Sequence, residues 1–206
     1  MKDCISLEER EVIPKGVQQT AVAEEKVQSF FFDDDYERLQ LLNKINIQLN
    51  NSNPTLFYPG CGADIFFPLI YVEKLFPKLK KANFFFVDTQ ECLNLLLTQL
   101  DDVNVSFSQD KNIITFYWKH LLVTLEFIIT DVFTMQLPSF DIYFERAFRI
   151  MKSEHPEYER WIFDALNPNG IIISDSGFQH LKLDQITAPK ELSGYGEMVV
   201  AVKPGS

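Results

Sequence analysis

From residue 51 onward, short apolar runs alternate with longer stretches in which apolar residues recur every three or four positions. The short runs are typical of strands buried on both faces, and the longer stretches predict amphipathic helices. This alternation indicates βαβ units around a mostly parallel sheet, which is an α/β fold. The predicted strands cover residues 55–58, 83–87, 103–107, 113–118, 121–130, 140–144, 171–174 and 198–203.

Three helices are expected among these strands. The first runs from Ile65 to about Leu79, and the second carries a leucine stripe from Leu93 to Leu100. In the third, the spacing of the apolar residues places them on one helix face: Tyr158, Trp161, Ile162, Ala165 and Leu166. The consecutive strands 103–107 and 113–118 predict a β-hairpin inserted into the sheet, with residues 108–112 as its turn.

The first fifty residues are polar, follow a helical period and contain a single glycine, Gly16. They predict a helical appendage, residues 1–50, in front of a domain formed by residues 51–206. Ser6 and Glu9 have capping-box spacing, Pro14 ends the helix that would follow, and a second helix is expected over 17–29. We expect the appendage to lie as a lid over the substrate side of the sheet.

A third helix of the appendage is predicted after the aspartates at positions 33–35. Its apolar residues form one stripe: Leu39, Leu42, Ile45 and Leu49. Aspartates at a helix start interact favourably with the helix dipole. We interpret the triplet as a cap rather than a metal site, because no histidine or second carboxylate cluster accompanies it.

Composition and charge narrow the function classes. The 206 residues are 46% hydrophobic and include 19 Phe, which excludes a disordered chain. The balance of 19 basic against 29 acidic residues gives a net charge of −10, which disfavours nucleic acid as a partner. Three scattered cysteines favour reduced thiols and a cytoplasmic location. The longest apolar run, 65–72, is too short to span a membrane.

Polar and glycine residues mark the ends of several predicted strands. Gly60 and Gly62 follow the first strand and allow a tight turn with close approach of a ligand to the backbone. Asp88 ends the second strand, where a carboxylate can accept hydrogen bonds from ribose hydroxyls. Asp131 ends a later strand, where a carboxylate suits an adenine amino group. Val132 follows it and suits packing on the adenine ring. Together these strand ends predict an adenosine-containing ligand.

Several segments, in their order along the chain, resemble a class I S-adenosylmethionine-dependent methyltransferase: the glycine turn, Asp88, and residues 129–133, 137–138, 140–144 and 166–173. The resemblance covers about residues 55–203. It implies a three-layer Rossmann-like sandwich with a mostly parallel, seven-stranded sheet. It also implies a terminal antiparallel hairpin, to which residues 182–187 and 198–203 would contribute, and S-adenosylmethionine as the cofactor.

The resemblance also assigns roles to residues. In that family the glycine turn lies under the methionine and ribose part of the cofactor, and the acids after the second and third strands bind ribose and adenine. The cofactor-binding residues that this implies are Tyr58, Gly60, Cys61, Gly62, Asp64, Asp88, Thr89, Asp131, Val132 and Glu145.

Two positions of the glycine turn depart from the family pattern. Tyr58 stands where the family has an acidic residue, and Asp64 stands where a third glycine is often found. Asp64 would either cap the following helix or bind the amino group of the cofactor. The turn therefore resembles a divergent branch of the fold, in which cofactor binding is better supported than catalysis.

Other polar residues near strand ends have two interpretations each. Glu145 would meet the amino end of the cofactor or act as a catalytic base, or it would form a surface ion pair with Arg146. Asp175 and Ser176 would touch substrate or belong to an ordinary polar loop. Cys61 has no base beside it in the sequence, which favours a small side chain in a tight turn over a nucleophile.

The histidines, His120, His155 and His180, have no metal-ligand spacing, so no metal is expected, although His180 would approach the site if its loop folded over it. We therefore expect a methyltransferase acting on a small molecule or a protein. The alternatives are an interaction module that keeps the fold, and a nicotinamide-dependent oxidoreductase. A nucleic-acid methyltransferase is disfavoured further, because residues 145–148 lack the Asn/Asp-Pro-Pro-Tyr/Phe turn that holds a base amine.

Overall fold

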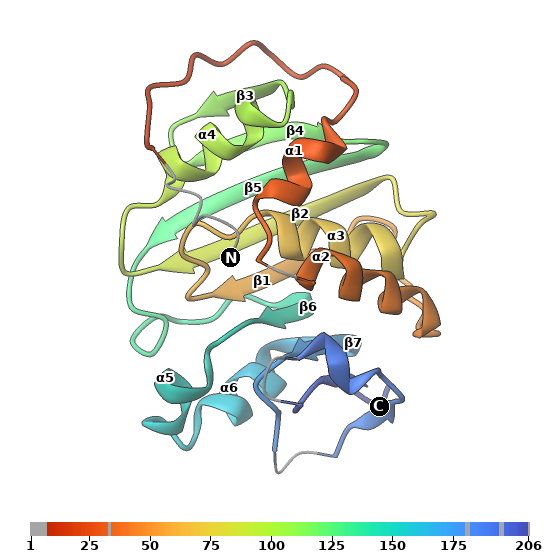
Figure 1. The fold of residues 1–206 in the computed structure, drawn as a ribbon. Helices are drawn as coiled ribbons and strands as arrows, with labels where there is room; N and C mark the ends of the chain where they lie inside the picture. The colour runs from red at the N-terminus through yellow and green to blue at the C-terminus, as the bar shows by residue number, and fades with distance from the viewer. Residues whose placement is uncertain (1–7, 33, 180–181, 194–195, 206) are drawn as a thin grey trace.

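The computed structural model describes residues 8–32, 34–179, 182–193 and 196–205, and its centre is one large sheet (Figure 1). In the described part of the chain the sheet has nine strands in the order β3-β4-β5-β2-β1-β6-β7-β9-β8. The strands are β1 Thr55–Pro59, β2 Lys81–Asp88, β3 Phe107–Asp110, β4 Ile113–Trp118, β5 Leu121–Ile129, β6 Phe140–Glu145, β7 Leu166–Ser174, β8 Asp184–Ile186 and β9 Val199–Val202.

The expected α/β fold is confirmed, and the strand count differs for a simple reason. Strands β5, β2, β1, β6 and β7 pair in parallel, and β9 runs antiparallel between β7 and β8 as the predicted terminal hairpin. These seven strands make up the expected sheet. The inserted hairpin, β3 and β4, adds two more beside β5 and pairs in an antiparallel manner.

The strand order reverses at β1, because the chain passes from β1 outward to β2 and β5 and then returns to β6 on the other side of β1. In open α/β sheets, ligands bind outside the carboxyl ends of the strands at such a reversal point. The fold therefore places a candidate site at the ends of β1 and β6.

Helices cover both faces of the sheet, which gives the three expected layers. The side chains of β2 alternate between the layers: Phe84 and Phe86 pack under one set of helices, and Phe85 packs toward the other. One face carries α1 Glu24–Ser29, α2 Asp35–Arg38, η1 Leu39–Lys44, α3 Phe66–Leu75 and α4 Leu93–Asp102, and the other carries α5 Arg149–Ser153 and α6 Tyr158–Ala165. A short 3-10 turn, η2 Lys190–Leu192, precedes β9.

The N-terminal segment differs from the prediction. The described residues 8–22 contain neither a helix nor a strand, and α1 covers only the end of the helix expected over 17–29. Instead, the backbone N–H of Gly16 donates to the carbonyl of Phe107, and that of Ala23 donates to the carbonyl of Val103. These bonds to another part of the chain replace helical ones. Ser6 of the proposed capping box lies outside the described residues.

The third predicted helix forms as α2 and η1 but ends at Lys44. Leu39 and Leu42 are buried, whereas Leu49 lies beyond the helix and is half-buried. Asp34 precedes α2 without a side-chain cap bond, and Asp35 lies in the first turn, where its charge suits the dipole. Asp33 lies outside the described residues.

Three smaller features differ from what the sequence led us to expect. Strand β3 begins at Phe107 and extends to Asp110, so the hairpin loop is only Lys111 and Asn112, and Lys111 takes a positive φ of 57°. Helix α5 was not expected, because five residues are too few to show a period. Trp161 is 43% exposed at the edge of the buried stripe of α6. None of the helices in the described residues has the length and hydrophobicity to cross a membrane.

Candidate functional site

The glycine turn after β1 is tied to the end of β2. Gly60 and Gly62 have positive φ values of 59° and 52°, a conformation that glycine adopts without strain. The N–H of Gly60 donates to the carbonyl of Val87 at 2.8 Å, and that of Gly62 donates to Oδ2 of Asp88 at 2.8 Å. The structure therefore brings the predicted glycines and the predicted acid into direct contact.

The contact between Gly62 and Asp88 leaves room for a ligand. A Cβ atom placed on Gly62 would meet no atom within 4 Å. Oδ1 of Asp88 accepts the N–H of Gln90 at 2.9 Å. Because each carboxylate oxygen can accept a second hydrogen bond, Asp88 keeps acceptor capacity for ligand hydroxyls. Thr89 is exposed beside it.

The other glycine of the turn is covered by an aromatic side chain. A Cβ on Gly60 would lie 2.6 Å from Cε2 of Phe148, which is 2% exposed. The Phe148 ring stacks on Phe133, with centroids 5.8 Å apart, and packs against Tyr158. A ligand that reaches Gly60 has to share this position with the Phe148 ring.

Tyr58 and Asp64, the two departures from the family pattern, interact with each other. The Tyr58 hydroxyl donates to Oδ2 of Asp64 at 2.9 Å, and the N–H of Phe67 donates to Oδ1 at 3.2 Å. Asp64 thus accepts a hydrogen bond from the first turn of α3, in the manner of the capping interpretation, although Ile65 occupies the N-cap position. Burial raises the pKa of Asp64, against the opposing attraction of Arg146, whose Nη1 lies 3.4 Å from Oδ2.

Cys61 lies inside the turn as a buried thiol. Burial raises the pKa of its side chain well above the ordinary value, and the charge of Asp88 acts in the same direction. A buried thiol that stays protonated is a poor nucleophile. This geometry agrees with the interpretation of Cys61 as a small side chain in a tight space.

The residues after β5 separate into one exposed and one buried side chain. Asp131 is exposed, and its Oδ1 accepts the N–H of Phe133 at 2.9 Å. Val132 packs in the core with Phe57 and Val87. Asp131 therefore remains a candidate for the adenine amino group. The Val132 side chain, in contrast, packs under the strand ends and not on the surface.

Glu145 does not form the surface ion pair with Arg146 that was one alternative, since its side chain is fully buried. Its Oε1 pairs with Nζ of Lys152 at 2.5 Å, and its Oε2 accepts the Tyr143 hydroxyl at 2.5 Å. Ser174 also donates to Oε1. Burial raises the pKa of Glu145, which the Lys152 charge opposes. This is the arrangement of a buried ion pair that holds α5 against the sheet, not of a base that faces a ligand.

Arg146, Ala147 and Phe148 connect β6 to α5 through a strained backbone. Ala147 has a positive φ of 52°, which is unfavourable for a residue with a side chain. Its N–H donates to Oδ1 of Asp175 at 2.9 Å, and the N–H of Phe148 donates to the Ser176 hydroxyl at 3.2 Å. Asp175 and Ser176 thus hold the segment that follows β6.

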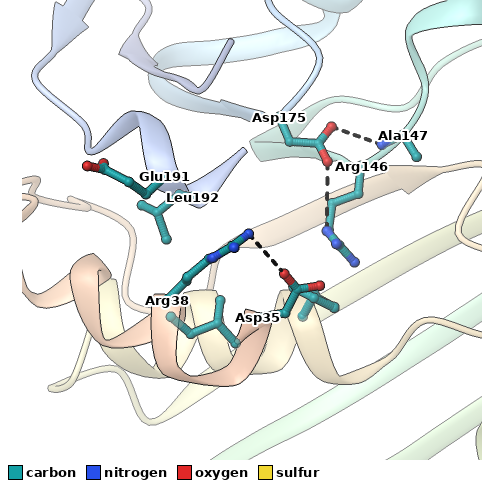
Figure 2. Close-up of a pocket in the computed structure, with 9 residues that line it drawn as sticks. Asp35, Arg38, Arg146, Ala147, Asp175, Glu191 and Leu192 are labelled. Carbon is teal, nitrogen blue, oxygen red and sulfur yellow. Dashed lines mark hydrogen bonds and ion pairs between the residues drawn. The ribbon is translucent and has the colours of Figure 1, made fainter. Parts of the chain in front are cut away.

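A cavity of about 350 Å³ lies beside this segment, between α2 and η2. Figure 2 shows Arg38 and Asp35 on one side of it and Arg146, Ala147 and Asp175 on the other. A second cavity of about 330 Å³ lies next to Asp64 and the phenylalanines at 30–32, and it shares Asp35 and Phe67 with the first. Arg146 lines both cavities.

The two histidines that the structure describes contact different parts of the fold. The His155 ring stacks on Phe133 with centroids 3.8 Å apart, and Nε2 of His120 lies 3.1 Å from the carbonyl oxygen of Pro77. His180 lies outside the described residues. Among the residues that the structure describes, no group of three or more His, Cys, Asp or Glu side chains could hold a metal ion.

Four residues near this edge were missed by the sequence reasoning: Arg38, Phe148, Lys152 and, as a cavity residue, Arg146. Arg146 and Phe148 directly follow β6, so the rule that ligands bind at strand ends could have found them. Arg38 and Lys152 lie on helices, and the sequence contains no signal for their positions.

The chain is similar in fold to solved structures of known proteins, although its sequence matches no family model and no curated protein. The cyclopropane synthase MmaA2 from Mycobacterium tuberculosis is 12% identical with a TM-score of 0.42, over 68% of this chain and 41% of that one. The S-adenosylmethionine-dependent methyltransferase SibL is 13% identical with a TM-score of 0.48, over 90% and 62%.

A SAM-dependent methyltransferase from Aquifex aeolicus is 12% identical with a TM-score of 0.45, over 89% of this chain and 99% of that one. This chain thus spans less than two thirds of the length of MmaA2 and SibL. At such identities and TM-scores the likeness concerns the fold and says nothing about the ligand or activity of this chain.

Proposed function

We propose that this protein binds S-adenosylmethionine at the carboxyl ends of β1, β2 and β5 and transfers its methyl group to a small molecule or a protein in the cytoplasm. One observation carries the proposal. At the point where the strand order reverses, the N–H of Gly62 lies on the Asp88 carboxylate, with open space beside the glycine. Such a strand-end acid beside a glycine turn is the arrangement that holds a ribose in nucleotide-binding sheets.

The residues fit the cofactor on this side of the turn. Asp88 would accept the two ribose hydroxyls, Asp131 would accept the adenine amino group, and the backbone at Gly62 would permit close approach. The cofactor supplies a methyl group that its sulfonium already activates, so the chain mainly has to bind, orient and exclude water. Arg146 and Asp175 line the cavity between α2 and η2, which an acceptor would enter.

A second candidate function is an interaction module that keeps the fold without catalysis. The observation that favours it is the Phe148 ring, which covers Gly60. If this ring keeps the methionine part of the cofactor out, the turn has only a structural role. The two candidates differ in a measurable way, because Phe148→Ala would uncover Gly60 and strengthen cofactor binding if the ring merely competes with the ligand.

Calorimetric titration with S-adenosylmethionine, S-adenosylhomocysteine and NAD tests the proposal. We expect the first two to bind and the Asp88→Ala variant to lose roughly tenfold or more in affinity, since two charge-assisted hydrogen bonds are removed. Asp110→Ala is the matched control, because Asp110 is an exposed acid at the end of β3.

Three outcomes oppose the proposal. If neither the wild-type protein nor Phe148→Ala binds any of the three ligands, the interaction module is the better hypothesis. Binding of NAD alone would falsify the methyltransferase assignment and favour an oxidoreductase. Equal loss of affinity in Asp88→Ala and Asp110→Ala would show that Asp88 does not hold the ligand.

A further inference from the structure

The cavity between α2 and η2 has a lining of mixed charge. It lies at the carboxyl ends of β6 and β7, and Figure 2 shows that its charged side chains come from several elements. Arg38 and Arg146 carry positive charge, and Asp35, Asp175 and Glu191 carry negative charge. Phe67, Leu39 and Leu192 supply the apolar part of the lining.

Arg146 is held in place but keeps donors for a ligand. Its Cζ lies 3.1 Å from the centroid of the Phe67 ring, so the ring supports one face of the guanidinium group. Its ion-pair distances are 3.4 Å to Asp64 and 3.9 Å to Asp175. Both exceed the usual range of about 2.7–3.2 Å for N–H···O bonds. Of its five N–H donors, Nη1 makes the long hydrogen bond to Oδ2 of Asp64, and this guanidinium group donates no other hydrogen bond to the residues that the structure describes.

Arg38 approaches the same space from the opposite wall. Its guanidinium group points into the cavity from α2 (Figure 2). Among the described residues it pairs with the carboxylates of Asp35 and Asp34, at 3.6 and 4.0 Å. These pairs are formed along one helix and are partly exposed, so they are weak. A ligand carboxylate between Arg38 and Arg146 would gain two cationic partners.

The acids of the lining exclude a simple anion as the best ligand. Asp35 and Asp175 lie on opposite walls beside the two arginines (Figure 2). An anion alone would be repelled by these carboxylates, and a cation alone by the guanidinium groups. A molecule with both charges, placed so that each meets its opposite, satisfies the two arginines together with Asp35 and Asp175.

We propose that this cavity binds a small zwitterion of the amino-acid type, with its carboxylate on Arg38 and Arg146 and its ammonium group on Asp35 and Asp175. The cavity volume and the small apolar surface of Leu39, Leu192 and Phe67 suit a compact ligand body. The proposal that a zwitterion binds depends only on the lining of this cavity and not on the cofactor site. That this zwitterion is the methyl acceptor rests on the proposed function. The link between the two sites is Arg146, which lines the cavity and pairs with Asp64 of the glycine turn.

Calorimetry with pooled L-α-amino acids, followed by the single members, tests the proposal. We expect at least one to bind, and its N-acetyl form and its methyl ester, which each lack one charge, to bind roughly tenfold more weakly or worse. Arg146→Gln and Arg38→Gln should each reduce the affinity by about tenfold. Arg149→Gln, which removes an exposed arginine paired with Glu197 outside the cavity lining, should leave it unchanged.

Thermal melting of each variant separates loss of binding from loss of fold. If Arg146→Gln melts at a lower temperature than the wild type, the affinity of Arg38→Gln decides the test, because Arg38 is more exposed than Arg146. The proposal is overturned if no amino acid binds, or if neither removal of a ligand charge nor loss of Arg38 changes the affinity. Asp88→Ala should keep amino-acid binding, so that failure of the cofactor site and failure of this cavity are observed separately.

Discussion

At the residue scale, Ala147 shows how a single backbone conformation positions several side chains. Its positive φ turns the chain so that Phe148 lies on Gly60 while Arg146 lines the polar cavity. The Asp175 carboxylate holds this conformation by accepting the Ala147 N–H. Backbone strain of this kind is often found at functional sites.

The strain predicts that Ala147→Gly stabilises the protein. Glycine adopts a positive φ without a steric penalty and keeps the N–H that donates to Asp175, so the free energy of unfolding should rise by about 1 kcal/mol. Chemical denaturation measures the change. Ala201→Gly, inside β9, is the control and should destabilise by about 0.5–1 kcal/mol. Destabilisation by both variants would contradict the strain argument.

At the element scale, ion pairs attach the N-terminal segment to the acidic end of α4. Arg10 pairs with Asp101 and Asp102 at 2.7 and 2.8 Å, and Lys15 pairs with Asp101 at 2.7 Å. Because these side chains are partly exposed, salt should weaken the pairs. The attachment of this segment is therefore more sensitive to solution conditions than the packing of α3 or α4.

The pairs predict a pH dependence. Hydrogen bonds from Lys15 and Arg10 lower the pKa of Asp101 from its ordinary value of 3.8. A lowered carboxyl pKa contributes stability above pH 3.8 that is lost as the pH falls through the folded value.

Trypsin at neutral pH should cut after Arg10 and Lys15 faster in Asp101→Asn than in the wild type. The protection of residues 8–20 from hydrogen exchange, taken relative to the intrinsic exchange rate at each pH, should likewise fall in acid. Unchanged cleavage and exchange would show that the ion pairs do not hold the segment.

At the scale of the whole molecule, residues 24–44 share a core with the sheet. Val27, Leu39 and Leu42 are fully or almost fully buried in the same cluster as α3 and α4. Burial of three such side chains contributes about 5 kcal/mol or more, which is comparable with the total stability of many domains. Residues 24–44 therefore contribute to the core of the sheet domain, whatever their role as a lid.

Deletion of residues 1–50 should consequently destabilise the whole protein. We expect the shortened chain to melt at a much lower temperature and to bind a hydrophobic dye, because the surface of α3 is uncovered. Calorimetry and dye fluorescence measure both effects. A shortened chain with the melting temperature of the full chain would support a separate lid, and its affinity for S-adenosylmethionine would then be the relevant comparison.

The parts of the molecule that the sequence predicted are those with local signals. Strand ends such as Asp88 follow from the apolar run before them, and the glycine turn follows from its residue types. The cover of Gly60 by Phe148, the pairing of Glu145 with Lys152 and the approach of Arg38 to Arg146 depend on packing between distant segments. A helix of five residues, such as α5, has no period to detect.

The two outer strands of the sheet are short and carry exposed acidic residues. Strand β3 has four residues and ends in Asp110, and β8 has three and begins with Asp184. Short, charged edges discourage pairing with the sheet of another molecule. Growth of the sheet by addition of strands from a neighbouring copy is thus disfavoured on both sides, so a concentrated solution of the folded protein should resist fibril formation.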